Sequence, residues 1–253
     1  MRIAIFSDIH GNLPALDAVL TDIERAGGVD ETWVLGDMLG LGPHPVQVWH
    51  RLMALPNARF VRGNCDRYLV TGDRPYPSIA DVEVDPSMIQ RIVEVTGSLA
   101  WSQGACSVEG CREWLAELPV EHRTELPEGA RVLCAHASPG HDDGPGLSND
   151  RPFEMLASLL DGCRVDLVFA GHTHRTLDVH IRRTHVVNVG SVSNPLLPDL
   201  RASWALLIAD EEGYAVEFHR AEYDTQSVID DLERLQHPGR RWISAHLRGE
   251  FRP

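Results

Sequence analysis

The chain has 253 residues, of which 43% are hydrophobic and 24% are charged, a balance typical of a globular protein that buries its core without disulfides. Its formal net charge of −14 excludes an overall basic surface of the kind that binds a nucleic-acid polymer, and no apolar stretch is long enough to cross a bilayer. The five cysteines are odd in number and form no CxxC pair, so we expect free thiols and a cytoplasmic protein without a signal peptide.

Short apolar runs along the chain predict the strands of the fold. They are rich in Val, Ile and Leu and are bounded by Gly, Asp or Asn. They cover residues 2–7, 31–36, 58–63, 130–135, 165–171, 185–190, 202–210 and 214–220. A Glu-Glu-Gly turn separates the last two runs, which predicts a hairpin.

Helical patterns lie between these runs. Leu16, Val19, Leu20 and Ile23 recur at the spacing of one helix face, and a similar pattern follows Phe153. The alternation of strands and helices predicts an α/β fold. It is interrupted at about 68–128, where we expect a helical insertion, and it ends in a helical arm at about 225–253. We expect one domain over residues 1–253.

Ligand-type side chains follow five successive predicted strands. They are Asp8 and His10, then Asp37, Asn64 and His136, and finally His172 and His174. A crevice outside the strand ends is where α/β sheets bind ligands. We expect each i, i+2 pair to point to one side of an extended backbone, and a glycine precedes Asp37, Asn64 and His172, where it permits close approach to a ligand. Taken singly, each motif is typical of a turn, but together they favour one buried site.

The chemistry of this ligand set favours transition metals. Four imidazoles, two carboxylates and one amide oxygen suit Mn first, with Fe, Zn, Ni or Co as alternatives. Seven ligands exceed the needs of one four-coordinate ion, so we expect two divalent ions that share a bridging carboxylate.

The motifs DIHGN, GDMLG, GNCD, HASPG and GHTH together resemble those of the calcineurin-like metallophosphoesterase superfamily, in its small bacterial and archaeal branch, from residue 1 to about 200. The resemblance implies an α/β/β/α sandwich of two mixed sheets with helices outside. It also implies in-line attack on a phosphomonoester or phosphodiester by a hydroxide that bridges two metals. One metal would be held by Asp8, His10 and His174, the other by Asn64, His136 and His172, with Asp37 between them.

Cys65 departs from the family pattern. Many members carry His directly after the Asn of this motif, and that His is assigned to protonating the leaving group. A neutral thiol can donate a proton but matches the task less well than imidazole, and simple packing of Cys65 is the alternative. We therefore expect esters with acidic leaving groups, such as aryl or nucleotide groups, to react faster than alkyl esters.

Several weaker candidates lie near the motifs, each with a plain structural alternative. His44, His141, Asp142 and Asp143 would line the cleft or belong to surface turns. Arg62 and Arg67 would bind a phosphate oxygen or form salt bridges. Tyr68, Tyr76 and Trp101 would stack on a base or pack.

Two classes of function follow from these observations. The first is a hydrolase that acts on a small phosphorylated substrate, with dinucleoside polyphosphates or phosphoproteins as alternative substrates. The second is a non-catalytic metal-binding scaffold, because the retromer subunit of this superfamily keeps the fold while losing ligands. All seven ligand positions are filled here, which favours the hydrolase. The sequence leaves the oligomeric state open.

Overall fold

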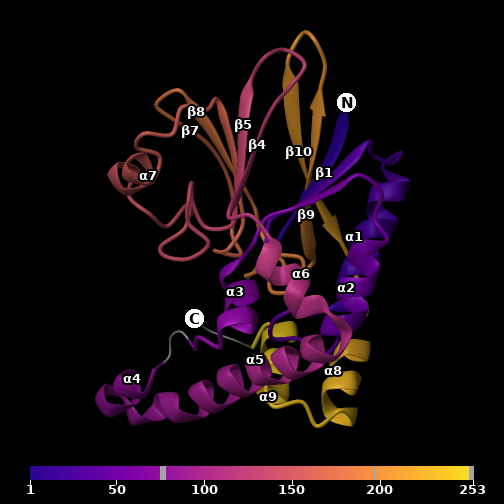
Figure 1. The fold of residues 1–253 in the computed structure, drawn as a ribbon, viewed down its shortest axis with the longest axis vertical. Helices are drawn as coiled ribbons and strands as arrows, with labels where there is room; N and C mark the ends of the chain where they lie inside the picture. Colours follow the sequence, from indigo (N-terminus) through magenta and orange to yellow (C-terminus); the bar gives the residue numbers. More distant parts are fainter. Residues whose placement is uncertain (75–77, 197, 251–253) are drawn as a thin grey trace.

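The computed structural model describes residues 1–74, 78–196 and 198–250. These residues form two five-stranded sheets with helices on their outer faces (Figure 1). The first sheet has the order β10-β9-β1-β2-β3 and the second β4-β5-β6-β8-β7. The strands of the first are β1 (Arg2–Phe6), β2 (Glu31–Val34), β3 (Ala58–Phe60), β9 (Ala202–Ala209) and β10 (Tyr214–Ala221). Those of the second are β4 (Glu121–Glu125), β5 (Arg131–Ala135), β6 (Leu167–Ala170), β7 (Thr176–Ile181) and β8 (Thr184–Val189).

Both sheets are mixed, as expected. In the first, β1, β2 and β3 run parallel and the β9–β10 hairpin is antiparallel to β1. In the second, β5, β6 and β8 run parallel, with β4 and β7 as antiparallel edge strands. The carboxyl ends of the parallel strands therefore meet along one border of each sheet, where the predicted ligands follow.

Three clusters of buried side chains hold the two sheets and their helices together, and a smaller one lies between the two helices of the C-terminal arm. Ile5, Trp33, Phe169 and Val187 belong to the cluster between the two sheets. A second cluster packs helices onto the outer face of the first sheet, and a third packs α7 onto the second sheet. This is the predicted four-layer α/β/β/α arrangement.

The helices cover the sheets and extend below them in Figure 1. They are α1 (Leu13–Arg25), α2 (Pro45–Met53), α3 (Asn64–Thr71), α4 (Ile79–Val84), α5 (Ile89–Glu109), α6 (Cys111–Glu117), α7 (Phe153–Leu159), α8 (Thr225–Arg234) and α9 (Arg240–Leu247), with a 3-10 turn at Pro86–Met88. Among the described residues, no helix is both long and apolar enough to span a membrane.

The helical segment is shorter than the sequence indicated. It ends at Glu117, and Glu121–Glu125, which the predicted insertion of about 68–128 included, forms edge strand β4. Its α5 packs against α9 of the C-terminal arm, where Glu94 Oε2 accepts a hydrogen bond from the Trp242 backbone N–H at 2.7 Å. The insertion and the arm therefore meet, although 130 residues (110–239) lie between the end of α5 and the start of α9.

Candidate metal centre

The predicted ligands lie on loops that follow the parallel strands. Asp8 and His10 follow β1, Asp37 follows β2, and Asn64 is the first residue of α3 after β3. His136 follows β5, while His172 and His174 lie between β6 and β7. The fold brings all seven side chains together, as the contacts below describe.

The backbone at these positions is not extended, contrary to our expectation for the i, i+2 pairs. Asp8, His10, Asp37, His172 and His174 have φ values of 59°, 47°, 52°, 69° and 59°, in the left-handed region. Each such residue costs on the order of 1–3 kcal/mol unless its surroundings stabilise it. The pairs converge because the chain turns sharply after each strand, rather than because side chains alternate along one.

A first set of ligand atoms surrounds Asp8. Its Oδ1 lies 3.1 Å from His174 Nε2 and 3.7 Å from His10 Nε2. The two imidazole Nε2 atoms lie 3.2 Å from each other. All three side chains are at least mostly buried, so their polar atoms face one another rather than water.

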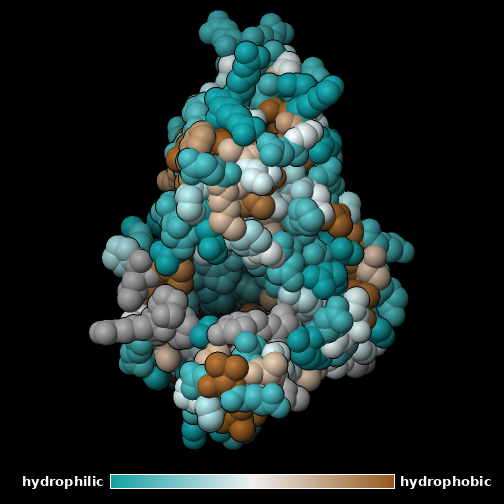
Figure 2. Space-filling view, turned by 90° about the vertical axis from the view of Figure 1, so that its left-hand side faces the viewer, coloured by the Kyte–Doolittle hydropathy of each residue, from teal (hydrophilic) through white to brown (hydrophobic). Residues whose placement is uncertain are grey.

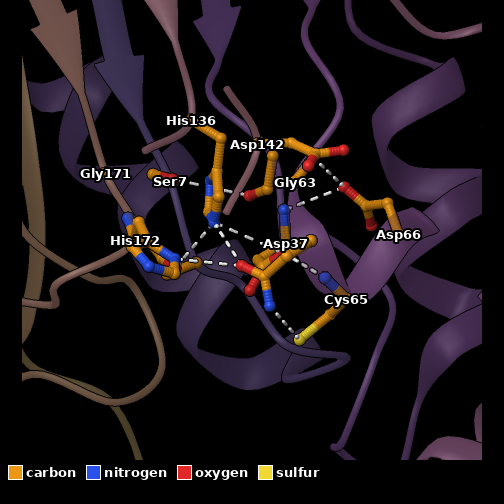
Figure 3. A network of polar contacts seen from close by, with 12 residues as sticks. Ser7, Asp37, Gly63, Cys65, Asp66, His136, Asp142, Gly171 and His172 are labelled. Atoms are coloured by element: carbon orange, nitrogen blue, oxygen red, sulfur yellow. Dashed lines mark hydrogen bonds and ion pairs between the residues drawn. The ribbon is translucent and has the colours of Figure 1, made fainter. Parts of the chain in front are cut away.

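A second set surrounds Asn64. Its Oδ1 lies 3.1 Å from His136 Nε2 and 3.0 Å from His172 Nδ1. Figure 3 shows His136, His172 and Asp37 directed toward one another. Asp37 lies between the two sets, because its Oδ2 is 3.8 Å from His10 Nε2 and its Oδ1 is 3.5 Å from His136 Nε2.

Backbone carbonyls decide which nitrogen of each imidazole faces the centre. His136 Nδ1 lies 2.6 Å from the Leu35 carbonyl oxygen, and His172 Nε2 lies 2.8 Å from that of Gly144. A carbonyl oxygen only accepts hydrogen bonds, so we assign the proton to the nitrogen that faces it. The other nitrogen then directs a lone pair at the centre, and carbonyls of Gly40 and Asn194 orient His10 and His174 in the same way.

This donor set fits a metal cation. With those tautomers, Asp8 Oδ1 and His174 Nε2 face each other as two acceptors, and in the described part of the chain Asp8 Oδ1 accepts no hydrogen bond although it is buried. Such an arrangement is costly unless a cation or a proton lies between the acceptors. Burial alone would lower the pKa of His136, but Asp37 and Asp8 raise it to about 10. The site thus has a strong affinity for positive charge.

Asp66 is a site residue that the sequence analysis missed. It is fully buried, its Oδ2 accepts hydrogen bonds from the backbone N–H groups of Asp37 at 2.8 Å and Gly63 at 2.9 Å, and its Oδ1 accepts one from Met38 at 3.0 Å. Burial, followed by the charge of Asp37, raises the pKa of Asp66 to about 6. Asp66 holds the loop that carries Asp37 against the start of α3 (Figure 3). Its place as the last residue of the GNCD motif was the available signal.

The glycines that precede Asp37, Asn64 and His172 allow the ligand loops to pack closely, as expected. A Cβ at Gly36, Gly63 or Gly171 would come within 3.0 Å of its neighbours, which real Cβ atoms essentially never do. At Gly63 those neighbours are the backbone nitrogen and the carboxylate of Asp37. These three positions therefore exclude a side chain so that the ligand loops can touch.

A cleft of about 330 Å³ opens over the ligand atoms. Its walls are largely apolar and come from the helical insertion and the C-terminal arm, with Tyr68, Arg91, Val95, Leu99, Trp242 and His246 among the lining residues. Figure 2 shows this side of the molecule hollowed below the sheets, with hydrophilic residues at the bottom of the hollow. The centre therefore lies at the base of a cavity whose upper walls suit an organic group.

Cys65 lines this cleft beside the ligands. Its backbone N–H donates to Asp37 Oδ1 at 2.8 Å, and Asn64 Nδ2 lies 3.7 Å from its Sγ. Burial and the carboxylate of Asp37 raise the pKa of the Cys65 thiol well above its usual value, so the thiol is neutral. The raised pKa makes it a weaker proton donor than an ordinary thiol, and it is not a thiolate nucleophile.

The weaker candidates have structural partners. His44 is buried rather than a surface loop residue, and its Nε2 lies 2.9 Å from Asp231 of α8, so it ties the ligand loop after β2 to the C-terminal arm. Arg62 and Arg67 both donate to Asp142, which favours their structural interpretation.

The remaining candidates divide between the cleft and the core. The Tyr68 hydroxyl donates to Asp143 at 2.5 Å while Tyr68 also lines the cleft. The Trp101 ring packs edge-on against His237. His141 lies on an exposed turn whose backbone pairs with Ser138, and Tyr76 falls outside the described residues.

Comparisons with known proteins agree with this architecture. The model of the calcineurin-like phosphoesterase superfamily domain matches residues 1–212. An uncharacterised protein of Methanocaldococcus jannaschii is 26% identical over an alignment of 263 positions. The alignment covers 97% of this chain and 96% of that protein.

Two crystal structures share the fold over nearly the whole chain. A hypothetical protein from Pyrococcus horikoshii superposes with a TM-score of 0.81 at 22% identity, covering 97% of both chains. A metallophosphoesterase from Sphaerobacter thermophilus has a TM-score of 0.77 at 26% identity, covering 99% of both chains. The insertion and the C-terminal arm are therefore part of the shared fold rather than additions peculiar to this chain.

Proposed function

The chain belongs to the calcineurin-like phosphoesterase superfamily, and we propose that it is a dinuclear-metal-dependent hydrolase of a small phosphodiester or phosphomonoester. The position of Asp37 carries this proposal. Its two carboxylate oxygens face different ligand sets, Oδ2 toward His10 and Oδ1 toward His136, as expected of a carboxylate that bridges two ions.

We assign the ligands by these two sets. Asp8, His10 and His174 would hold one ion, and Asn64, His136 and His172 the other, with Asp37 shared. The nitrogen and oxygen donors favour Mn, with Fe, Zn, Ni or Co as alternatives. When bound, the two cations supply a water of lowered pKa and offset the negative charge that grows on the phosphate oxygens.

The residues around the centre have separate tasks. In hydrolysis, a water molecule releases one proton to solvent as its oxygen bonds to phosphorus, the ester P–O bond breaks, and the departing alkoxide oxygen takes up one proton. The neutral thiol of Cys65 lines the cleft and is the candidate donor of that proton, but an acidic alcohol departs without one. Apolar residues such as Val95 and Leu99 exclude water and contact the organic group. Aryl and nucleotide esters should therefore react faster than alkyl esters.

A metal reconstitution experiment tests the proposal. The protein is stripped with a chelator, reloaded in turn with Mn, Fe, Zn, Ni, Co and Mg, and assayed with p-nitrophenyl phosphate, bis-p-nitrophenyl phosphate and methyl phosphate. We expect two metal ions per chain, hydrolysis that requires them, and the lowest rate for methyl phosphate. Asp37→Asn should abolish hydrolysis, whereas Asp17→Asn, which alters an exposed ion pair with Arg51, should leave it intact.

The same experiment separates the alternatives. A protein that binds two metals but hydrolyses none of these esters would favour the scaffold function. Hydrolysis confined to dinucleoside polyphosphates or to phosphoproteins, tested in the same panel, would identify those substrates instead.

A further inference from the structure

A second pocket adjoins the metal centre, and the sequence analysis assigned it no role. It has a volume of about 280 Å³ and shares His174 and Leu196 with the apolar cleft. Polar side chains line much of it, among them Arg175, Thr176, Ser203 and Arg220. The candidate ligand His174 therefore stands at the junction of two cavities of different character.

The strands hold the two arginines of this pocket in place. Arg175 directly follows His174 and precedes β7, while Arg220 is near the end of β10. Arg220 Nη1 donates to Ser203 Oγ at 2.7 Å and its Nη2 donates to Thr176 Oγ1 at 3.4 Å. Since Thr176 and Ser203 belong to different sheets, the Arg220 guanidinium is fixed where the two sheets meet.

The positive charge of these arginines is only loosely balanced. Arg175 Nε lies 3.9 Å from Asp150, and Arg220 Nε lies 3.8 Å from Asp199. Asp199 is already bound by Arg201, which donates to it at 2.7 Å and 3.0 Å and lowers its pKa to about 2. Asp199 also lines the pocket, so two guanidinium groups outnumber one carboxylate there, in a chain of net charge −14.

We propose that this pocket binds a second phosphate group of the substrate. The inference rests on the proposed function and narrows the substrate to a phosphoester that carries one apolar group and one anionic group. The apolar group of the substrate lies against α5 and α9, and its second phosphate reaches Arg175 and Arg220. The guanidinium of Arg175 suits this task because its parallel N–H groups match two phosphate oxygens. Arg220, whose Nη atoms already donate to Ser203, Thr176 and the His219 carbonyl, contributes mainly its positive charge.

Two chromogenic substrates test whether the pocket binds a second phosphate group. Thymidine 5′-(p-nitrophenyl phosphate) is compared with the same compound bearing a 3′-phosphate, using the manganese-loaded protein and nitrophenolate release. We expect kcat/KM to be about tenfold higher for the 3′-phosphorylated compound, the effect of one added charged hydrogen bond. The double variant Arg175→Gln/Arg220→Gln should bring this ratio to about one, and Arg182→Gln, at an exposed ion pair with Asp161, should keep the wild-type ratio.

The ratio within one variant is independent of how much of that variant is folded. Calorimetric binding of thymidine 3′,5′-bisphosphate against thymidine 5′-phosphate gives a readout that needs no turnover, and we expect the bisphosphate to bind about tenfold more tightly. If no metal supports hydrolysis, the proposed function fails and this binding ratio alone decides the pocket. Equal binding of the two nucleotides, or a preference that survives in the double variant, overturns the inference.

Discussion

Replacing Gly63 with Ala tests how closely the ligand loops pack. Gly63 has a φ of −93°, which any residue adopts, so backbone strain is not the issue at this position. An added Cβ would instead meet the backbone nitrogen and the carboxylate of Asp37 closer than 3.0 Å. Both partners are buried and neither is the flexible end of a long side chain, so Asp37 itself would have to move.

The expected cost combines overpacking with lost hydrogen bonds. Overpacking a core costs about 1–3 kcal/mol. Movement of Asp37 also disturbs its backbone bond to Asp66 and the Cys65 N–H bond to its carboxylate, both 2.8 Å long. A hydrogen bond to a charged group contributes about 1.5–3 kcal/mol, so overpacking and the loss of one such bond should together lower the free energy of unfolding by about 2.5–6 kcal/mol.

Urea unfolding and metal analysis measure the two consequences. Gly63→Ala should unfold at lower urea concentration than the wild type and retain fewer than two metal ions per chain. The matched control is Gly104→Ala, on the exposed side of α5, where no atom lies within 4 Å of the added Cβ. This variant should gain about 0.5–1 kcal/mol in the free energy of unfolding, because Ala favours a helix more than Gly does. A Gly63→Ala protein with wild-type stability and full metal content would refute the packing argument.

Three further predictions follow from the same residues. The native protein should expose at most two thiols to Ellman's reagent, those of Cys163 and of Cys65 in the cleft, against five after denaturation, because Cys106, Cys111 and Cys134 are buried. His174→Ala should lower the metal content from two ions to one, measured by elemental analysis, while a retained second ion would contradict the assignment of the ligand sets. Burial lowers the pKa of His237 from 6.5 to about 4, so its neutral form stabilises the fold fully above pH 6.5 and this stability is lost as the pH falls toward 4. His237→Asn, which keeps an acceptor for the Gly239 N–H, should remove up to about 3 kcal/mol of the difference in unfolding free energy between pH 7 and pH 4.

Hydrophobic patterning was sufficient to predict most of the fold. All eight predicted strands exist, and every predicted run but that of β10, whose Val216 is half-buried, carries buried Val, Ile or Leu between turn residues. Two strands were missed, and only one of them lacks that signal: β4 reads Glu-His-Arg-Thr-Glu, and it pairs with β5 as an exposed edge. An edge strand contributes backbone hydrogen bonds more than buried side chains, so its sequence need not be apolar. The other missed strand, β7, has buried Leu177 and Ile181 at alternating positions, a strand pattern that the sequence analysis overlooked.

The hydrophobic pattern of the sequence did not predict contacts between distant segments of the chain. The sequence placed His44 either at the cleft or on a surface turn, but its partner Asp231 lies 187 positions away. The apolar walls of the cleft likewise come from α5 and α9, segments that meet only in the folded chain. Spacing within one segment predicts local structure, whereas the meeting of distant segments depends on the packing of the whole core.

The left-handed backbone of the ligands and the burial of Asp66 have one explanation. Five strained ligand residues would relax into ordinary conformations if the loops were free, since each costs on the order of 1–3 kcal/mol. Asp66 opposes this by binding three backbone N–H groups around the Asp37 loop. The Asp66 carboxylate binds backbone N–H groups and not the atoms that would ligate the metal, so it stabilises this geometry with or without a cation. The Asp37 loop is therefore held in place before the metal arrives, and Asp66→Asn, which can accept at only one oxygen, should weaken metal binding while every proposed ligand is still present.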